Sequence, residues 1–167
     1  VSQYLKRGIP VGLGTDSAVS NNSLNMLQEM KFGLLLQRAR YPEENFYLTA
    51  PKALRQATIE GARVLGMDDQ IGSLEPGKRA DLVILRLPPE LEPTFAKIVS
   101  FVVYAAGPED IEAVVVNGRV VLRHGQVTTL DEPALREEIE HRFEGRWPQW
   151  PPMENLPPVQ DSLRTLM

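Results

Sequence analysis

The stretch from Ile9 to Ser17, IPVGLGTDS, constrains the fold of this chain more than any other segment. A short apolar run beside Gly8 and Pro10 is typical of a buried strand, and glycine marks where a backbone or a ligand must approach closely. We expect a strand from Ile9 to Gly14. Asp16 then follows its carboxyl end, where barrels and open α/β sheets place their chemistry. A second interpretation stays open, in which Asp16 only caps the turn after the strand.

The composition is that of a soluble, globular protein. The chain has 167 residues, which is one ordinary domain or parts of two, and 43% of them are hydrophobic and 24% charged. Because the net charge is −4 and no basic stripe is present, we expect no nucleic-acid partner. No apolar run approaches the roughly 20 residues of a membrane span, so we expect no membrane association and see no signal peptide. The lack of cysteine fits a reducing compartment, and we expect a cytoplasmic location.

Helical periodicity dominates the chain as far as Gly66. Because Val1 lies within a helical pattern, we expect a piece of a longer polypeptide, although a processed or trimmed chain would look the same. The pattern predicts a helix end over Val1–Arg7, a polar loop over Ser17–Ser23, a helix to about Arg40, and a second helix from Thr49 to Gly66 with Pro51 in its first turn. Asn21 or Asn22 is the expected N-cap of the helix that runs to Arg40.

After Gly72 the apolar period changes from about 3.6 to 2, which predicts strands. The clearest signal is the pair Asn117-Gly118 between two β-branched runs, which predicts a hairpin with a type I′ turn. The other expected elements are strands at Ala80–Leu87 and Gly125–Thr129, a helix-then-strand or a strand at Phe95–Tyr104, a helix at Glu132–Phe143 capped by Asp131, and an extended proline-rich tail at 147–158.

Four motifs together resemble one protein family. They are GTDSAVSNNSLNMLQEM at Gly14–Met30, ATIEGARVLG at Ala57–Gly66, IGSLEPGKRADLVIL at Ile71–Leu85, and VVVNGRVV at Val114–Val121. In this order they are similar to the metal-dependent amidohydrolase superfamily. The most similar branch contains the chlorohydrolases and deaminases that act on cytosine, guanine, adenosine-type and triazine compounds. The resemblance covers about residues 1 to 130.

The resemblance implies an α/β fold that is incomplete at its N-terminal side. Residues 1–68 would be the C-terminal part of a TIM-like (β/α)8 barrel, namely its last strand and the helices that follow. Residues 69–130 would be the C-terminal part of a small β-sandwich, and 131–167 a C-terminal helix with a proline-rich tail. The missing N-terminal part of the same protein is then the expected partner of this chain, and a homodimer is also possible.

The same resemblance implies a divalent metal cofactor, zinc or iron, with Asp16 as a metal ligand and as the catalytic proton shuttle. The histidine ligands and the glutamate of the family fall outside this sequence. His124 and His141, the two histidines present, lie in segments that the family uses as scaffold, so we expect surface or packing residues. A catalytic zinc needs about three protein ligands besides water, so we expect this chain alone to be inactive.

Polar residues beside Asp16 are further candidates. Asn21, Asn22 and Ser23 are candidates for lining the substrate pocket, with helix capping as the equally open alternative. Thr15 and Ser17 either orient the carboxylate or are turn hydroxyls. We expect Glu29 to be a solvated or structural charge.

Two functions follow. The first is a metal-dependent hydrolase that acts on the C–N bonds of a purine-, pyrimidine- or triazine-like ring, with triazine dechlorination as a close variant and a small heterocycle as substrate. The alternative is a catalytically inactive remnant that survives as a binding or assembly module.

Overall fold

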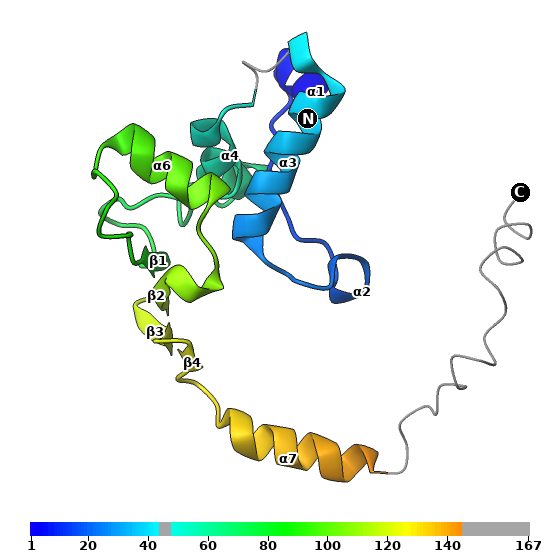
Figure 1. Ribbon diagram of the computed structural model, residues 1–167, viewed down its shortest axis with the longest axis vertical. Coiled ribbons are helices and arrows are strands. Elements are labelled where there is room, and N and C mark those ends of the chain that lie inside the picture. The colour runs from blue at the N-terminus through cyan, green and yellow to red at the C-terminus, as the bar shows by residue number, and fades with distance from the viewer. Residues whose placement is uncertain (44–47, 145–167) are drawn as a thin grey trace, which may run out of the picture. The chain divides into compact units, whose positions relative to one another are not determined.

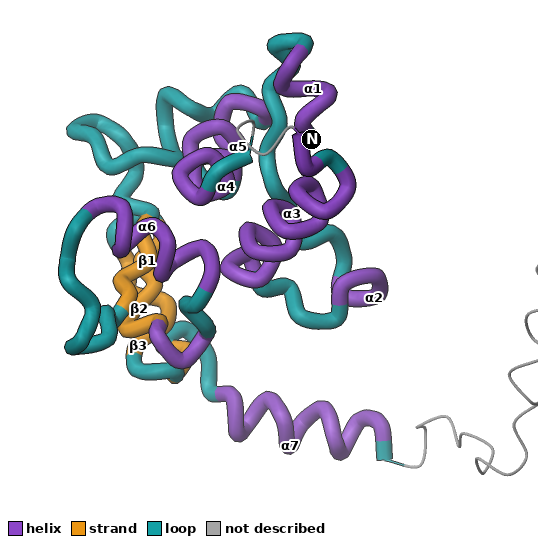
Figure 2. Tube along the Cα trace, turned by 45° about the horizontal axis from the view of Figure 1, so that its top comes forward, coloured by secondary structure: helices purple, strands orange, loops and turns teal. Residues whose placement is uncertain are grey.

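The computed structural model describes residues 1–43 and 48–144. They belong to two compact units, Val1–Thr129 and a second unit that begins at Leu130. The elements of the first unit are shown in Figures 1 and 2: α1 (Ser2–Lys6), α2 (Ala18–Asn21), α3 (Met26–Arg40), α4 (Ala50–Gln56), α5 (Ile59–Val64), β1 (Leu82–Leu85), α6 (Phe95–Tyr104), the 3-10 helix η2 (Pro108–Asp110), β2 (Ile111–Val116), β3 (Arg119–Arg123) and β4 (Gln126–Val127). The second unit contains α7 (Glu132–Phe143).

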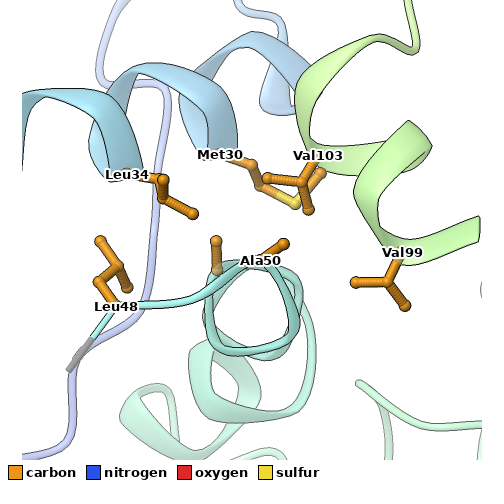
Figure 3. Packing of buried hydrophobic residues seen from close by; sticks show 7 residues of the cluster. Met30, Leu34, Leu48, Ala50, Val99 and Val103 are labelled. Atoms are coloured by element: carbon orange, nitrogen blue, oxygen red, sulfur yellow. The ribbon is translucent and has the colours of Figure 1, made fainter. Parts of the chain in front are cut away.

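Helices α3, α4 and α6 pack around the core of the first unit. Figure 3 shows their buried side chains pointing toward one another. The cluster consists of Met30, Leu34, Leu48, Ala50, Ala53, Val99 and Val103. Phe95–Tyr104 was expected to be either a helix followed by a strand or a strand alone. Both interpretations are wrong, because the whole segment is helix α6. Its Val99 and Val103, four residues apart, bury one helical stripe against the other two helices, and the Thr94 hydroxyl accepts the N–H of Lys97.

The strands form one antiparallel sheet in the order β1-β2-β3-β4. The predicted hairpin is confirmed: β2 and β3 pair across Asn117 and Gly118, whose φ angles of 49° and 78° are those of a type I′ turn. Asp81, just before β1, accepts the backbone N–H of Asn117, so the edge of the sheet is tied to the hairpin turn. The described residues thus form a partial α/β domain with a four-stranded antiparallel sheet.

Two elements of the barrel part differ from expectation. The segment Ile9–Gly14 is not a strand, because a strand needs the backbone of a neighbouring strand, and the described residues give Leu13 N–H only the carbonyl of Gln56, at 3.0 Å. The predicted helix from Thr49 to Gly66 is two helices, α4 and α5. Thr58 breaks it, with φ −128° and ψ −106°.

The remaining predictions have mixed outcomes. Helix α7 begins where expected, with the Asp131 carboxylate accepting the N–H of Ala134 at 3.0 Å. The proline-rich tail at 147–158 lies outside the described residues, and the domain division 1–68, 69–130 and 131–167 stays a prediction. In the described part of the chain, no helix has the length and hydrophobicity that a membrane crossing requires.

Candidate functional site

Asp16 lies in a tight loop that carries the chain from the extended segment into α2. Its φ of +58° is in the left-handed region, which aspartate tolerates better than most residues. The loop that was expected at Ser17–Ser23 contains the short helix α2. Ser17 is its N-cap and accepts the N–H of Ser20.

This turn brings a hydroxyl to the Asp16 carboxylate. Ser20 Oγ lies 2.8 Å from Asp16 Oδ2 and donates a hydrogen bond to it. Thr15 Oγ1 instead donates to the main-chain oxygen of Asp16, and Ser17 Oγ lies 3.2 Å from Ser20 Oγ. The residue that orients the carboxylate is therefore Ser20, four positions away, which the sequence patterns did not single out.

Asp16 lines an open hollow of about 390 Å³, which is within the usual size range of small-molecule sites. Three segments contribute to it: the loop before α2, the end of α2 with the turn that follows it, and the first turns of α3. The lining residues are Gly14, Thr15, Asp16, Ser20, Asn21, Ser23, Gln28, Glu29 and Phe32. The last three were not expected, although residues 25, 28, 29 and 32 repeat at helical spacing and so share one face of α3.

Asn21 joins two walls of this hollow. Its Nδ2 donates to Glu29 Oε1 at 2.7 Å, and its Oδ1 accepts from Ser23 Oγ at 3.0 Å. Glu29 therefore makes a structural contact with Asn21 and also lines the hollow. Asn22, at the end of α2 with φ +67°, is exposed and is not among the residues that line the hollow.

Neither Asn21 nor Asn22 caps α3, so that prediction is wrong. Asn25 is the N-cap, with its Oδ1 accepting from Leu27 N and Gln28 N at 3.0 and 3.3 Å. Its extended backbone, φ −99° and ψ 103°, is the N-cap geometry, whereas the positive φ of Asn22 is not.

Two carboxylates line this hollow, Asp16 and the Glu29 that accepts from Asn21, and the described residues contain no group of three or more side chains that could hold a metal ion. A carboxylate oxygen is a suitable ligand for zinc or iron, but a single one is insufficient for a stable site. The two histidines are surface residues, as expected: His124 Nδ1 lies 2.7 Å from Glu112 Oε1 on the sheet, and His141 is exposed on α7. Asp16 is thus chemically fit to be one ligand of a larger set.

Comparison with known proteins assigns the family. The model of the amidohydrolase family matches residues 1–121, which is most of the chain. The chain belongs to the amidohydrolase family.

Its relatives by sequence are named deaminases. A 5-methylthioadenosine/S-adenosylhomocysteine deaminase of Desulforudis audaxviator is 44% identical over 141 residues, which is 84% of this chain and 32% of the relative. A 5′-deoxyadenosine deaminase of Methanothermobacter thermautotrophicus is 43% identical over 141 residues, again 84% and 32%. The chain therefore spans about a third of the length of the curated relatives that it matches.

Two solved structures are similar to this chain in fold. An adenosine deaminase from Xanthomonas campestris with bound zinc superposes with a TM-score of 0.75 at 32% identity, covering 87% of this chain and 33% of that one. Atrazine chlorohydrolase from Arthrobacter aurescens, complexed with zinc, gives a TM-score of 0.71 at 30% identity, covering 84% and 31%.

Proposed function

We propose that this chain is the C-terminal part of a metal-dependent hydrolase that removes the amino group from a purine-like ring. The observation that carries the proposal is the Asp16 carboxylate at the edge of an open, polar hollow. The names of the sequence relatives, which are adenosine-type deaminases, favour a purine over a triazine. In the proposed protein, Ile9–Gly14 is the last barrel strand and pairs with strands of a preceding N-terminal part, and residues 69–130 belong to a β-sandwich.

Asp16 is the proposed metal ligand of this chain, with zinc or iron as the metal and the other ligands in the preceding part. Zinc in the similar structures of an adenosine deaminase and a chlorohydrolase supports a divalent ion. When bound, such an ion lowers the pKa of a water molecule toward neutrality.

Asp16 is also the proposed proton shuttle. Its carboxylate takes the proton of the attacking water as the water oxygen bonds to the ring carbon, and then gives it to the amino nitrogen, which leaves as ammonia. Ser20 holds one carboxylate oxygen through its hydroxyl and so limits rotation of the group. Asn21 is the better of the two proposed substrate contacts, because it lines the hollow and Asn22 does not.

The test is Asp16→Asn in the intact protein, with Asp69→Asn as the matched control. Asp69 is exposed on the loop after α5 and lies outside the hollow. We expect D16N to lower kcat/KM for 5-methylthioadenosine or a related purine nucleoside by at least about 10²-fold, because both proton transfers are lost. Zinc content should fall as well, and D69N should leave both unchanged.

Retained turnover in D16N would refute the proposed role. A substrate panel of adenosine-type nucleosides, guanine and a chlorotriazine separates deamination from dechlorination. An intact wild-type protein that binds no metal and converts no member of the panel would favour the alternative, an inactive binding or assembly module.

A further inference from the structure

The segment that leads to Asp16 touches the junction between α4 and α5 at unusually short range. A Cβ atom on Gly12 would lie 2.9 Å from the Cα of Gly61, a distance that real Cβ atoms essentially never show. Neither glycine has a positive φ, so space and not backbone conformation requires glycine here. One residue on, Leu13 N–H donates to the carbonyl of Gln56 at 3.0 Å.

The junction itself is shaped to offer that carbonyl. Thr58 ends α4 at Gln56, and its hydroxyl donates to the carbonyl of Leu54 at 2.8 Å, which satisfies a helix-end acceptor. A Cβ on Gly61 would lie 3.0 Å from the Gln56 oxygen. Thr58 and Gly61 therefore leave the Gln56 carbonyl accessible to the Leu13 N–H.

We propose that the junction Gln56–Gly61 positions Asp16 for metal binding and proton transfer. This inference rests on the proposed function of Asp16. Leu13 and Asp16 are three residues apart, so a displacement of the backbone at Gly12 or Leu13 is passed along a short peptide to the carboxylate. Misplacement of a reacting group by about 1 Å can cost on the order of 10²-fold in rate. Gly12, Thr58 and Gly61 are the positioning residues.

A pair of glycine variants in the intact protein tests the proposal. Gly12→Ala forces the two backbones apart. Gly33→Ala, on α3, adds a methyl group beside the same segment, but at an ordinary 3.5 Å from Leu13 Cδ2. We expect G12A to lower kcat by about 10²-fold and to lose zinc on dialysis, with KM changed much less, whereas G33A keeps wild-type kcat and zinc.

A second pair covers the case in which G12A does not fold. Thr58→Val keeps the shape of the side chain and removes the hydroxyl, and Thr58→Ser restores the hydroxyl. We expect T58V to lower kcat and the zinc retained after dialysis, and T58S to recover both. A purely structural role would instead lower the melting temperature of T58V and leave the kcat and zinc content of the folded enzyme unchanged.

The two proposals fail separately in this panel. Loss of turnover in D16N together with wild-type kcat and zinc in folded G12A and T58V overturns the positioning role alone. Full turnover in D16N overturns the proposed function of Asp16.

Discussion

At the scale of single residues, Glu60 on α5 is held between two arginines. Its Oε1 lies 2.6 Å from Arg55 Nη2 and 2.9 Å from Arg63 Nη1. The hydrogen bond from Arg55 is the main reason that the pKa of Glu60 lies below its ordinary value of 4.5, while partial burial opposes the shift. The pair with Arg55 joins the end of α4 to α5, and the pair with Arg63 lies within α5.

This geometry predicts a pH-dependent contribution to stability. Because the folded state lowers the pKa of Glu60, the contribution is present above about pH 4.5 and is lost as the pH falls through the lowered value. Glu60→Gln should therefore reduce the free energy of unfolding near neutral pH, by no more than about 1 kcal/mol because the arginines are half exposed. Chemical denaturation at pH 7 and near pH 3 measures this. An equal difference at both pH values would contradict it.

Residue patterns located Asp16 and Asn21 at one hollow but missed Ser20, Gln28 and Phe32. The contact of Ser20 with Asp16 depends on the left-handed φ of Asp16, which turns the chain back on itself. A sequence does not reveal that angle, because aspartate is also common in turns with negative φ. Gln28 and Phe32 belong to a helix whose apolar spacing drew attention to the opposite, buried face.

At the scale of elements, the start of α3 decides where Glu29 and Phe32 lie relative to Asp16. Asn25 fixes this start through two hydrogen bonds to backbone N–H groups that otherwise have no helical partner. The same turn carries Gln28 and Glu29 into the wall of the hollow. A weaker cap would therefore loosen one wall of the site.

We predict that Asn25→Ala lowers the free energy of unfolding of the intact protein by about 0.5–2 kcal/mol, the usual range for loss of an N-cap. Asn25→Ser, which keeps a side-chain oxygen acceptor, should recover most of it. Thermal and denaturant unfolding measure both variants. Equal stability of N25A and wild type would show that the cap does not hold α3.

Elements whose signals are local were predicted from the sequence. The Asn117-Gly118 hairpin and helix α7 with its Asp131 cap follow from turn and capping chemistry within a few residues. The strand at Ile9–Gly14 was not found, because a strand depends on neighbours that the described residues do not supply. The break at Thr58 was missed, because the spacing of the apolar residues between Thr49 and Gly66 is compatible with one continuous helix.

At the scale of the whole molecule, the described residues of the first unit include strongly exposed apolar side chains and a buried amide without a hydrogen-bond partner. Val19, Leu65, Leu74 and Phe95 are each more than 70% exposed. Gln56 is 2% exposed, and neither polar atom of its side chain has a hydrogen-bond partner among the described residues. A buried amide without partners costs about 1–3 kcal/mol. In the proposed protein, the preceding part covers the exposed apolar side chains.

A hybrid enzyme tests this proposal directly. We replace the 141 matching residues of the Desulforudis audaxviator deaminase with those of this chain, to which they are 44% identical. If the chain completes the metal site and the fold, the hybrid should deaminate 5-methylthioadenosine, and the same hybrid with Asp16→Asn should be at least about 10²-fold slower. The unmodified relative is the positive control. A folded hybrid that retains zinc but releases no ammonia would contradict the proposed catalytic role and favour the inactive module.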